Sequence, residues 1–368
     1  MTKTTTTVPS IEEFVAGRDE AKFVENQGLT RTARMLRSQL AKTKDELTET
    51  VSDLHATEQS LALFQAPIQR PPWLTPKKLA PRAGTLLAVL SDTHYGEVVR
   101  PEEMGNYNKF DLAIAEQRTE RFFRRLIRVA RDYFAGVKYD GIVLALGGDL
   151  VSGDIHEELV QTNEISTNET VLWAVPRLAA GIEMLSKEFG QVHVASVPGN
   201  HGRDGKIPRY KGRSAHNADT LIAHLVARQF QGSANVTFDV PRSIDATFKI
   251  YDFTFALEHG EELQKKFAGN AEIGALGPLM RGTNRTKVQR AAEGTKIDYC
   301  IWAHFHQLLD LPGRGFIANG SLKGYDEYAR GNKFQPEPPQ QFVGIVDPVW
   351  GVTQKAPLIL GDRKAEKW

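Results

Sequence analysis

The stretch IVLALGGD, from Ile142 to Asp149, decides the fold class of this chain. Its five successive apolar residues are too few for a membrane-spanning helix and favour a strand buried on both faces, as in a parallel sheet. Gly147 and Gly148 lack a Cβ, so the backbone can turn sharply there. Open α/β sheets bind ligands beyond the carboxyl ends of their strands, which makes Asp149 a candidate ligand. An acid after a strand is also a common helix cap, so the motif alone leaves both interpretations open.

Four other apolar strands are expected to end in polar side chains. These side chains are Asp92 and His94, Asn200 and His201, His259, and His304 and His306. Helical patterns over about 111–134 and 167–189 separate the first three strands, and this βαβ alternation predicts a layered α/β fold. Short strands near 307–311, 315–318, 341–346 and 351–359 predict a second sheet packed on the first.

The residue types at these strand ends indicate a metal centre. Alternate side chains of an extended segment share a face, so Asp92 with His94, and His304 with His306, can converge on one point. Imidazole nitrogen mixed with carboxylate or amide oxygen suits transition metals rather than Ca²⁺ or Mg²⁺ alone. The candidates exceed the needs of one open site, whereas two ions sharing a carboxylate would use them all. We therefore expect two divalent ions, Mn²⁺ foremost, with Fe, Zn and Ni as alternatives.

Five short motifs occur in the order and context of one family. They are DTH (92–94), GGD (147–149), GNH (199–201), HG (259–260) and HFH (304–306). Over residues 85–350 the chain thereby resembles the calcineurin-like metallophosphoesterases. The stretches GGDLVSGDIHEEL, GNHGR and NGSLKGYDEYA are most similar to a branch from phage and prophage genomes, and a distant likeness runs to the nuclease subunit of double-strand-break repair complexes. The resemblance implies a four-layer α/β/β/α sandwich.

The same resemblance implies roles for the polar side chains. One metal would be held by Asp92, His94, Asp149 and His306, and the other by Asp149, Asn200, His259 and His304. His201 would be the catalytic imidazole. Two such ions would lower the pKa of a shared water, so that hydroxide attacks phosphorus in line with the leaving oxygen. Gly202 follows GNH where the family often has an acid, so Asp92 or a backbone carbonyl would have to fix the His201 tautomer.

A basic loop after His201 indicates the substrate. Residues 203–213 carry five cations against one acid. Such charge beside a metal centre can contact the phosphates that flank a scissile one, although a solvated loop is the alternative. The candidate substrate contacts are Arg203, Arg209, Lys211, Arg213 and His156, with Tyr210 as a base-stacking side chain. We expect a metal-dependent phosphodiesterase of nucleic acid or oligonucleotides, nuclease-like. The alternatives are a phosphomonoesterase or nucleotide hydrolase, and a DNA- or partner-binding module with a vestigial site.

The 368 residues suggest one large α/β domain with an extension. The expected parts are a disordered tail over 1–10, a helical extension over 11–65, a Pro-rich linker over 66–84, the catalytic domain over 85–360 and a C-terminal tail over 361–368. Leucines at 40, 47, 54 and 61 recur every seventh position and predict a homo-oligomeric coiled coil. A helix packed on its own domain, or a helix-turn-helix over 25–40, are the alternatives.

The amino-acid composition limits the classes of partner and the cellular locations that we expect for this chain. A net charge of +1 argues against an overall polyanion-binding surface but permits a local basic patch. The single cysteine, Cys300, cannot form an internal disulfide and fits a reducing cytoplasm. No apolar run approaches 18 residues, so we expect no membrane span. These features predict a cytoplasmic protein, acting in the host cytoplasm if it is phage-encoded.

Overall fold

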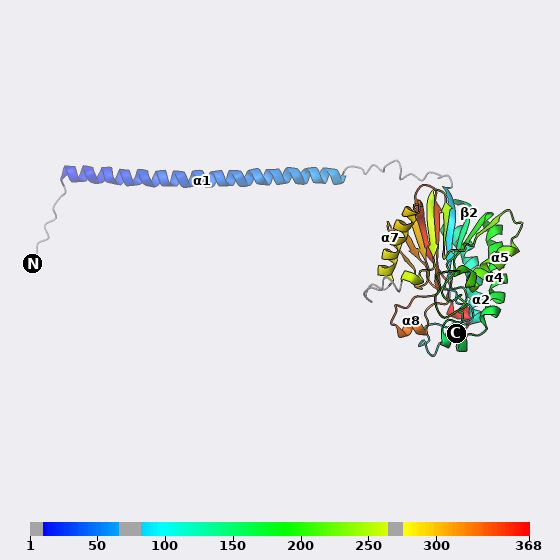
Figure 1. Cartoon of the computed structure of the whole chain (residues 1–368). Coiled ribbons are helices and arrows are strands. Elements are labelled where there is room, and N and C mark those ends of the chain that lie inside the picture. The colour runs from blue at the N-terminus through cyan, green and yellow to red at the C-terminus, as the bar shows by residue number, and fades with distance from the viewer. Residues whose placement is uncertain (1–9, 66–81, 264–274, 312) are drawn as a thin grey trace, which may run out of the picture. The chain divides into compact units, whose positions relative to one another are not determined.

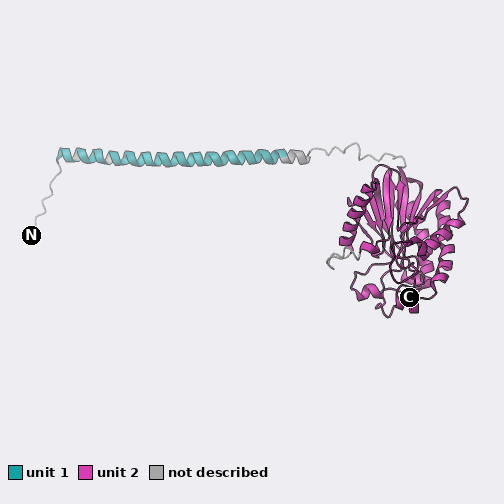
Figure 2. Ribbon diagram, viewed as in Figure 1, with its two compact units in different colours: residues 1–79 teal, residues 80–368 magenta. Residues whose placement is uncertain are grey.

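The computed structural model describes residues 10–65, 82–263, 275–311 and 313–368. The chain divides into two units, residues 1–79 and 80–368 (Figure 2). Within the first unit, α1 (Ile11–Gln65) is one uninterrupted helix of 55 residues. The expected tail up to residue 9 and the expected linker up to residue 81 lie outside the described residues. No helix of the described chain is long and apolar enough to cross a membrane.

A six-stranded sheet forms the first layer of strands in the second unit. Its order is β11 (Gly351–Ile359), β10 (Gln340–Asp347), β1 (Arg82–Leu90), β2 (Val137–Leu146), β3 (Val192–Ser196) and β4 (Val236–Asp239). The strands β1 to β4 are parallel, whereas β10 pairs antiparallel with β1. The expectation that the last strands join a second sheet is therefore wrong for β10 and β11, because β1 had an unpaired edge to which β10 returns. The domain also begins earlier than residue 85, since β1 starts at Arg82.

A second, five-stranded sheet faces the first. Its order is β5 (Asp245–Ile250), β6 (Phe253–Glu258), β7 (Tyr299–Trp302), β9 (Phe316–Ala318) and β8 (Leu309–Asp310). The central strands β6, β7 and β9 run parallel to one another. Their carboxyl ends therefore lie at one edge of this sheet.

The second unit contains the following helices and helical turns among its described residues. They are α2 (Leu112–Arg128) with the π-turn η2 (Val129–Tyr133), α3 (Glu157–Thr162), α4 (Thr167–Phe189), the 3₁₀ turn η3 (Ser214–His216), α5 (Ala218–Gln229), α7 (Leu276–Ala292), α8 (Glu327–Gly331) and α9 (Arg363–Glu366). Helices α2, α4 and α5 lie on the side of the first sheet, and α7 lies on the side of the second (Figure 1). The domain is thus the α/β/β/α sandwich expected.

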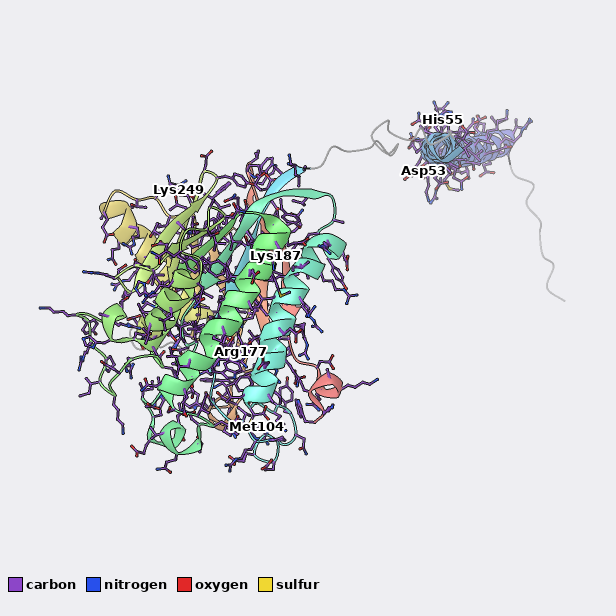
Figure 3. The ribbon with its side chains drawn as sticks, turned by 90° about the vertical axis from the view of Figure 1, so that its right-hand side faces the viewer. Asp53, His55, Met104, Arg177, Lys187 and Lys249 are labelled. Carbon is purple, nitrogen blue, oxygen red and sulfur yellow. The ribbon has the colours of Figure 1, made fainter. Side chains whose placement is uncertain are left out.

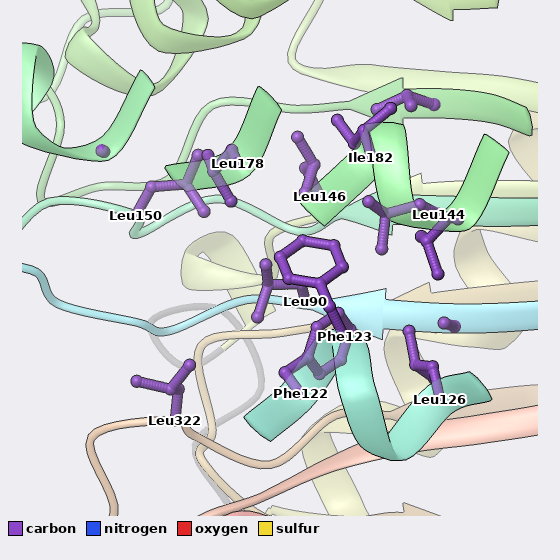
Figure 4. Packing of buried hydrophobic residues seen from close by; sticks show 14 of the residues in the cluster. Leu90, Phe122, Phe123, Leu126, Leu144, Leu146, Leu150, Leu178, Ile182 and Leu322 are labelled. Carbon is purple, nitrogen blue, oxygen red and sulfur yellow. The ribbon is translucent and has the colours of Figure 1, made fainter. Parts of the chain in front are cut away.

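Side-chain alternation along the central strands creates separate cores. Leu86, Ala88 and Leu90 of β1 point to the helices, whereas Leu87 and Val89 point between the two sheets. Figure 4 shows the helix side, where Leu90, Leu144 and Leu146 meet aromatic rings of α2. Each such leucine contributes about 1.5–3 kcal/mol when fully buried. The run 142–146 is buried on both faces, as its sequence predicted.

Local chemistry sets the ends of α4. Ser166 caps its N-terminus in a capping box with Glu169, and Gly190 ends it at a φ of 74°. Arg177 lies on the surface of α4 (Figure 3). Its guanidinium carbon is 4.0 Å from the centre of the Trp173 ring, and its guanidinium donates to Glu116 of α2. Helix α4 therefore spans the predicted range and is tied to α2 at the surface.

The C-terminus is not a tail. Residues 363–366 form α9, and the carboxylate of Glu366 is fully enclosed by the guanidinium groups of Arg118 and Arg121 on α2. Arg118 is itself completely buried. The expected tail over 361–368 is therefore part of the domain, because an ion pair that no local pattern reveals anchors it.

Candidate metal centre

Polar side chains from five strand ends converge at the carboxyl edge shared by the two sheets. They follow β1, β2 and β3 of the first sheet and β6 and β7 of the second. Three overlapping groups have potential ligand atoms within 4.8 Å of one another. The groups are Asp92, His94 and His306; His94, Asp149 and His201; and Asp149, His259 and His304. The sequence identified all of these residues, and the fold brings them together.

The first group joins β1 to β7. The Nε2 atoms of His94 and His306 face each other at 3.2 Å, and Nε2 of His306 lies 3.3 Å from Oδ1 of Asp92. The other carboxylate oxygen of Asp92 accepts a hydrogen bond from Ser91. Two imidazoles and a carboxylate oxygen thus aim at one point, a donor set that suits a divalent transition metal.

The third group, formed by Asp149, His259 and His304, centres on Asp149. Nε2 of His259 lies 3.1 Å from Oδ2 of Asp149 and 3.0 Å from Oδ1 of Asn200. The ring of His304 is 5.1 Å from that of His259. Asp149 also belongs to the group with His94, so its carboxylate lies between the two clusters. Clustered histidines and aspartates of this kind can hold a divalent metal ion.

The backbone at these strand ends is strained. Nine non-glycine residues of the described chain have positive φ, and five of them belong to the centre. These five are Asp92, His94, Asp149, His304 and His306, with φ between 45° and 68°. Each such conformation costs about 1–3 kcal/mol and persists where surrounding structure enforces it. These backbone conformations direct the five side chains toward one another, at a cost in local stability.

Hydrogen bonds at Nδ1 orient the imidazoles. Nδ1 of His259 lies 2.8 Å from the carbonyl oxygen of Gly147, and Nδ1 of His201 lies 2.7 Å from that of Ser152. A carbonyl only accepts, so both rings carry their proton on Nδ1 and turn Nε2 toward the centre. Of the two groups expected to fix the His201 tautomer, the backbone carbonyl does so.

Burial and mutual charge shift the pKa values of several groups in the centre. Burial opposes the charge on Asp149, but His259 and His201 outweigh it and hold the pKa of Asp149 well below its usual value. Burial likewise opposes protonation of His259, yet Asp149 and Asp92 raise the pKa of His259 to about 10. Burial lowers the pKa of His94 to about 4 and that of His304 to about 3. A cation bound beside Asp149 would take the place of the proton on His259.

Asp219, at the start of α5, supports the loops that carry the centre. The sequence analysis did not identify it. Its carboxylate accepts hydrogen bonds from the backbone N–H groups of Asp149, Leu150 and Gly199. Burial, followed by repulsion from Asp149, raises the pKa of Asp219 to about 6. Asp219 thereby joins the GGD loop to the GNH loop. In the sequence it resembles an ordinary residue of a first helical turn.

Two glycines permit these loops to touch. Gly148 has a φ of 85°, and a Cβ there would overlap the backbone nitrogen of Gly199. A Cβ on Gly199 would in turn overlap the carboxylate of Asp149. The expected role of Gly148 is thus sharpened, because it admits a neighbouring loop to the back of Asp149.

The basic loop is less positively charged than its sequence suggests. Arg213 pairs with Glu261 at 2.6 Å and with Glu262, and Arg203 lies 3.5 Å from Glu261. Lys206 pairs with Glu157. Arg203 and Arg213, expected to contact substrate, instead hold the loop against the segment after His259. The acids are remote in sequence, so the charge count of the loop could not reveal this pairing.

The remaining candidates for substrate contact are three exposed loop residues and His156. Arg209 and Lys211 are exposed, and Tyr210 is 85% exposed. The ring of His156, at the N-terminus of α3, lies 5.6 Å from that of His201. His156 therefore reaches the centre, whereas Arg209, Tyr210 and Lys211 are exposed to solvent.

No family model and no curated protein matches this sequence. Among solved structures, it is similar to Vacuolar Protein Sorting 29 from Cryptosporidium parvum, at 15% identity over 72% of this chain and 86% of that one, with a TM-score of 0.29. It is also similar to a dimetal phosphatase from Danio rerio, at 11% identity over 75% of this chain and 99% of that one, with a TM-score of 0.33. TM-scores this low carry no argument about chemistry, which has to rest on this chain's own residues.

Proposed function

We propose that the chain is a dinuclear-metal-dependent phosphodiesterase. The observation that carries this proposal is the convergence of two His/Asp clusters on the carboxylate of Asp149. In the proposed assignment, Asp92, His94, Asp149 and His306 hold one ion, and Asp149, Asn200, His259 and His304 hold the other. The motifs that resemble calcineurin-like metallophosphoesterases support the assignment. Two bound divalent ions, with Mn²⁺ as our first choice, would neutralise phosphate oxygens and acidify water at the site.

The chain's own groups would orient the reaction. Nδ1 of His201 is held by the Ser152 carbonyl, which leaves Nε2 turned toward the centre. When protonated, that nitrogen can donate to the leaving oxygen of the phosphate or stabilise its charge. The backbone N–H of His201 donates to Oδ1 of Asp149, so the imidazole and the shared carboxylate are fixed relative to each other. His201 is therefore our candidate for the general acid.

Nucleic acid or an oligonucleotide is the proposed substrate, with Arg209 and Lys211 as contacts to flanking phosphates and Tyr210 as a stacking platform for a base. One observation favours a second candidate, a phosphomonoesterase or nucleotide hydrolase. Three of the five loop cations are paired with acids, which leaves little positive charge for a long backbone. The binding-module alternative has no such support.

Model substrates separate these activities. We expect the full chain with Mn²⁺ to hydrolyse bis-p-nitrophenyl phosphate. Turnover of p-nitrophenyl phosphate alone would favour the monoesterase. Single-stranded, duplex and cyclic oligonucleotides then identify the preferred diester. Absence of turnover with every divalent ion tested would contradict both enzymatic proposals.

The bridging carboxylate is tested by Asp149→Asn. Because both ions would share Asp149, we expect metal content to fall below one ion per chain and turnover to fall at least about a hundredfold. Asp252→Asn, in the exposed turn between β5 and β6, is the matched aspartate control and should bind metal and turn over as the wild type does. Near-wild-type metal content and turnover in a folded Asp149→Asn protein would refute the assignment.

We further infer that the protein acts in the cytoplasm, in the host cytoplasm if the chain is phage-encoded, and that it self-associates through α1.

A further inference from the structure

A buried lysine in the stretch NGSLKGYDEYA (319–329) has no part in the proposed chemistry. Lys323 is 2% exposed, and its Nζ lies 2.7 Å from Oε1 of Glu97 and 2.5 Å from Oδ2 of Asp326. Glu97 and Asp326 are buried as well. Burying an ammonium with two carboxylates costs several kcal/mol of desolvation, which only close pairing offsets. Such an arrangement needs an explanation beyond stability.

The second oxygen of Glu97 leads to the metal centre. Oε2 of Glu97 lies 3.2 Å from Nδ1 of His94. Nδ1 makes no well-aligned hydrogen bond within the described residues, and Glu97 offers the acceptor in reach. On the other side of the ring, Nε2 faces His306. The ring of His94 therefore lies between an anionic acceptor and the first cluster.

We infer that Lys323, acting through Glu97, is a positioning residue that fixes the tautomer and direction of His94. Lys323 can only donate, so it engages one oxygen of Glu97 and leaves the other to accept the proton on Nδ1. The lone pair of Nε2 then points to the ion, as in other carboxylate–histidine–metal arrangements. The inference rests on the proposed metal centre and adds to it a residue that lies 226 positions from Glu97 in the sequence.

The same stretch holds the neighbouring ligand Asp92. Ser321 donates to the carbonyl oxygen of Asp92 at 2.9 Å. Asn319 donates at 2.8 Å to Oγ of Ser91, which in turn donates to Oδ2 of Asp92. Residues 319–329 therefore support both candidate ligands that follow β1, Asp92 and His94.

Glu97→Gln gives a sharp test because the lysine orients the new amide. Lys323 would bind the amide oxygen, so the NH₂ group would face Nδ1 of His94. His94 would then carry its proton on Nε2 and could not ligate an ion through that atom. The ammonium group of Lys323 still has a counter-charge, because it remains paired with Asp326. We expect affinity for the first Mn²⁺ or Zn²⁺ to fall about 10–100-fold by calorimetry.

Histidine ¹⁵N resonances of the metal-free protein provide a readout independent of activity. The wild type should show the Nδ1–H tautomer of His94, assigned by its loss in His94→Asn, and Glu97→Gln should show the Nε2–H tautomer. Adding Lys323→Met to Glu97→Gln frees the amide to turn its oxygen to His94, and should restore part of the affinity. Asp326→Asn keeps the side-chain oxygen that caps α8 and the contact between Lys323 and Glu97, so the wild-type tautomer should persist.

The outcomes separate this inference from the proposed function. If the wild type binds two ions but Glu97→Gln keeps both its affinity and the Nδ1–H tautomer, the inference is wrong and the metal centre stands. If Lys323→Met gives no recovery in the Glu97→Gln background, Lys323 does not orient residue 97. A wild-type protein that binds no divalent ion would overturn the proposed function and this inference together.

Discussion

At the scale of single residues, the centre combines strained ligands with glycines that admit close contacts. Asp149 has a φ of 51°, and Gly148 before it has a φ of 85°. The chain leaves β2 and turns back at once, so that the carboxylate faces the second sheet. The backbone of Gly199 fills the space behind this turn. Local strain is the cost of placing a carboxylate where two clusters meet.

Gly148→Ala should show this constraint. A Cβ at that φ is strained and overlaps the backbone of Gly199, so we expect a loss of at least about 2 kcal/mol in the free energy of unfolding. Because Asp149 moves with the loop, metal affinity should fall as well. Urea denaturation and metal titration measure the two effects. Gly331→Ala in α8, where a Cβ has open space, is the control, and an equally small effect of both substitutions would contradict this account.

At the scale of elements, α9 links the C-terminus to the rear of the metal centre. Glu366 receives two hydrogen bonds from Arg118, at 3.1 and 3.0 Å. Arg118 also donates to the carbonyl oxygens of Leu322 and Lys323, within the segment that supports the β1 ligands. A four-residue helix with no stability of its own is thus held by an enclosed ion pair.

Glu366→Gln should destabilise the domain by about 3 kcal/mol, since it leaves the Arg118 guanidinium buried without a counter-charge. The effect should depend on pH. Burial opposes the charge of Glu366, but Arg118 outweighs it and lowers the pKa of Glu366 to about 2. A lowered pKa in the folded state stabilises the fold above the unfolded value, about 4.5, and this contribution disappears as the pH falls through about 2.

Urea denaturation of both proteins from pH 7 to pH 2 measures this difference. We expect the gap between wild type and Glu366→Gln to be constant above about pH 5 and to shrink below it. Glu120→Gln, which removes an exposed pair with Arg124, should cost less than about 1 kcal/mol at every pH. A gap that grows toward low pH would contradict the sign of the argument.

At the scale of the whole molecule, α1 taken by itself presents a row of exposed apolar side chains. Leu40, Leu47 and Leu54 are 57–71% exposed and recur at heptad spacing. The intervening column is largely threonine, which weakens the seam without abolishing it. A second copy of α1 would cover these leucines, and we propose this homo-oligomer as the state of the full chain.

Light scattering tests the proposal directly. The full chain should have at least twice the mass of one chain, whereas a chain shortened to begin at Pro71 should be monomeric. Leu47→Asp with Leu54→Asp should dissociate the full chain, because both charges would face the seam. Ser52→Asp, on the opposite side of the helix, should not. Monomeric behaviour of the full chain and the shortened chain alike would contradict the coiled coil.

Much of the site could be predicted because its residues directly follow strands. An apolar run and the polar side chains after it are adjacent in sequence, and parallel strands deliver their ends to one edge. The supporting residues escaped prediction for the opposite reason. Asp219 acts on Asp149 from 70 positions away, and Lys323 acts on Glu97 from 226 positions away. Asp219 looks like an ordinary residue of a first helical turn, and nothing in the stretch around Lys323 shows that this lysine is buried beside Glu97.

The sequence by itself determined the strands, the α/β alternation and the polar side chains that end each strand, because these depend on periodicity and on neighbours in the chain. Only the tertiary structure decided that β10 and β11 return to the first sheet, that the C-terminus is enclosed, and that Arg203 and Arg213 are neutralised. These outcomes depend on which distant groups meet. Asp149 illustrates both cases. Its place at the end of a strand follows from the local sequence, whereas the groups around its carboxylate come from both sheets.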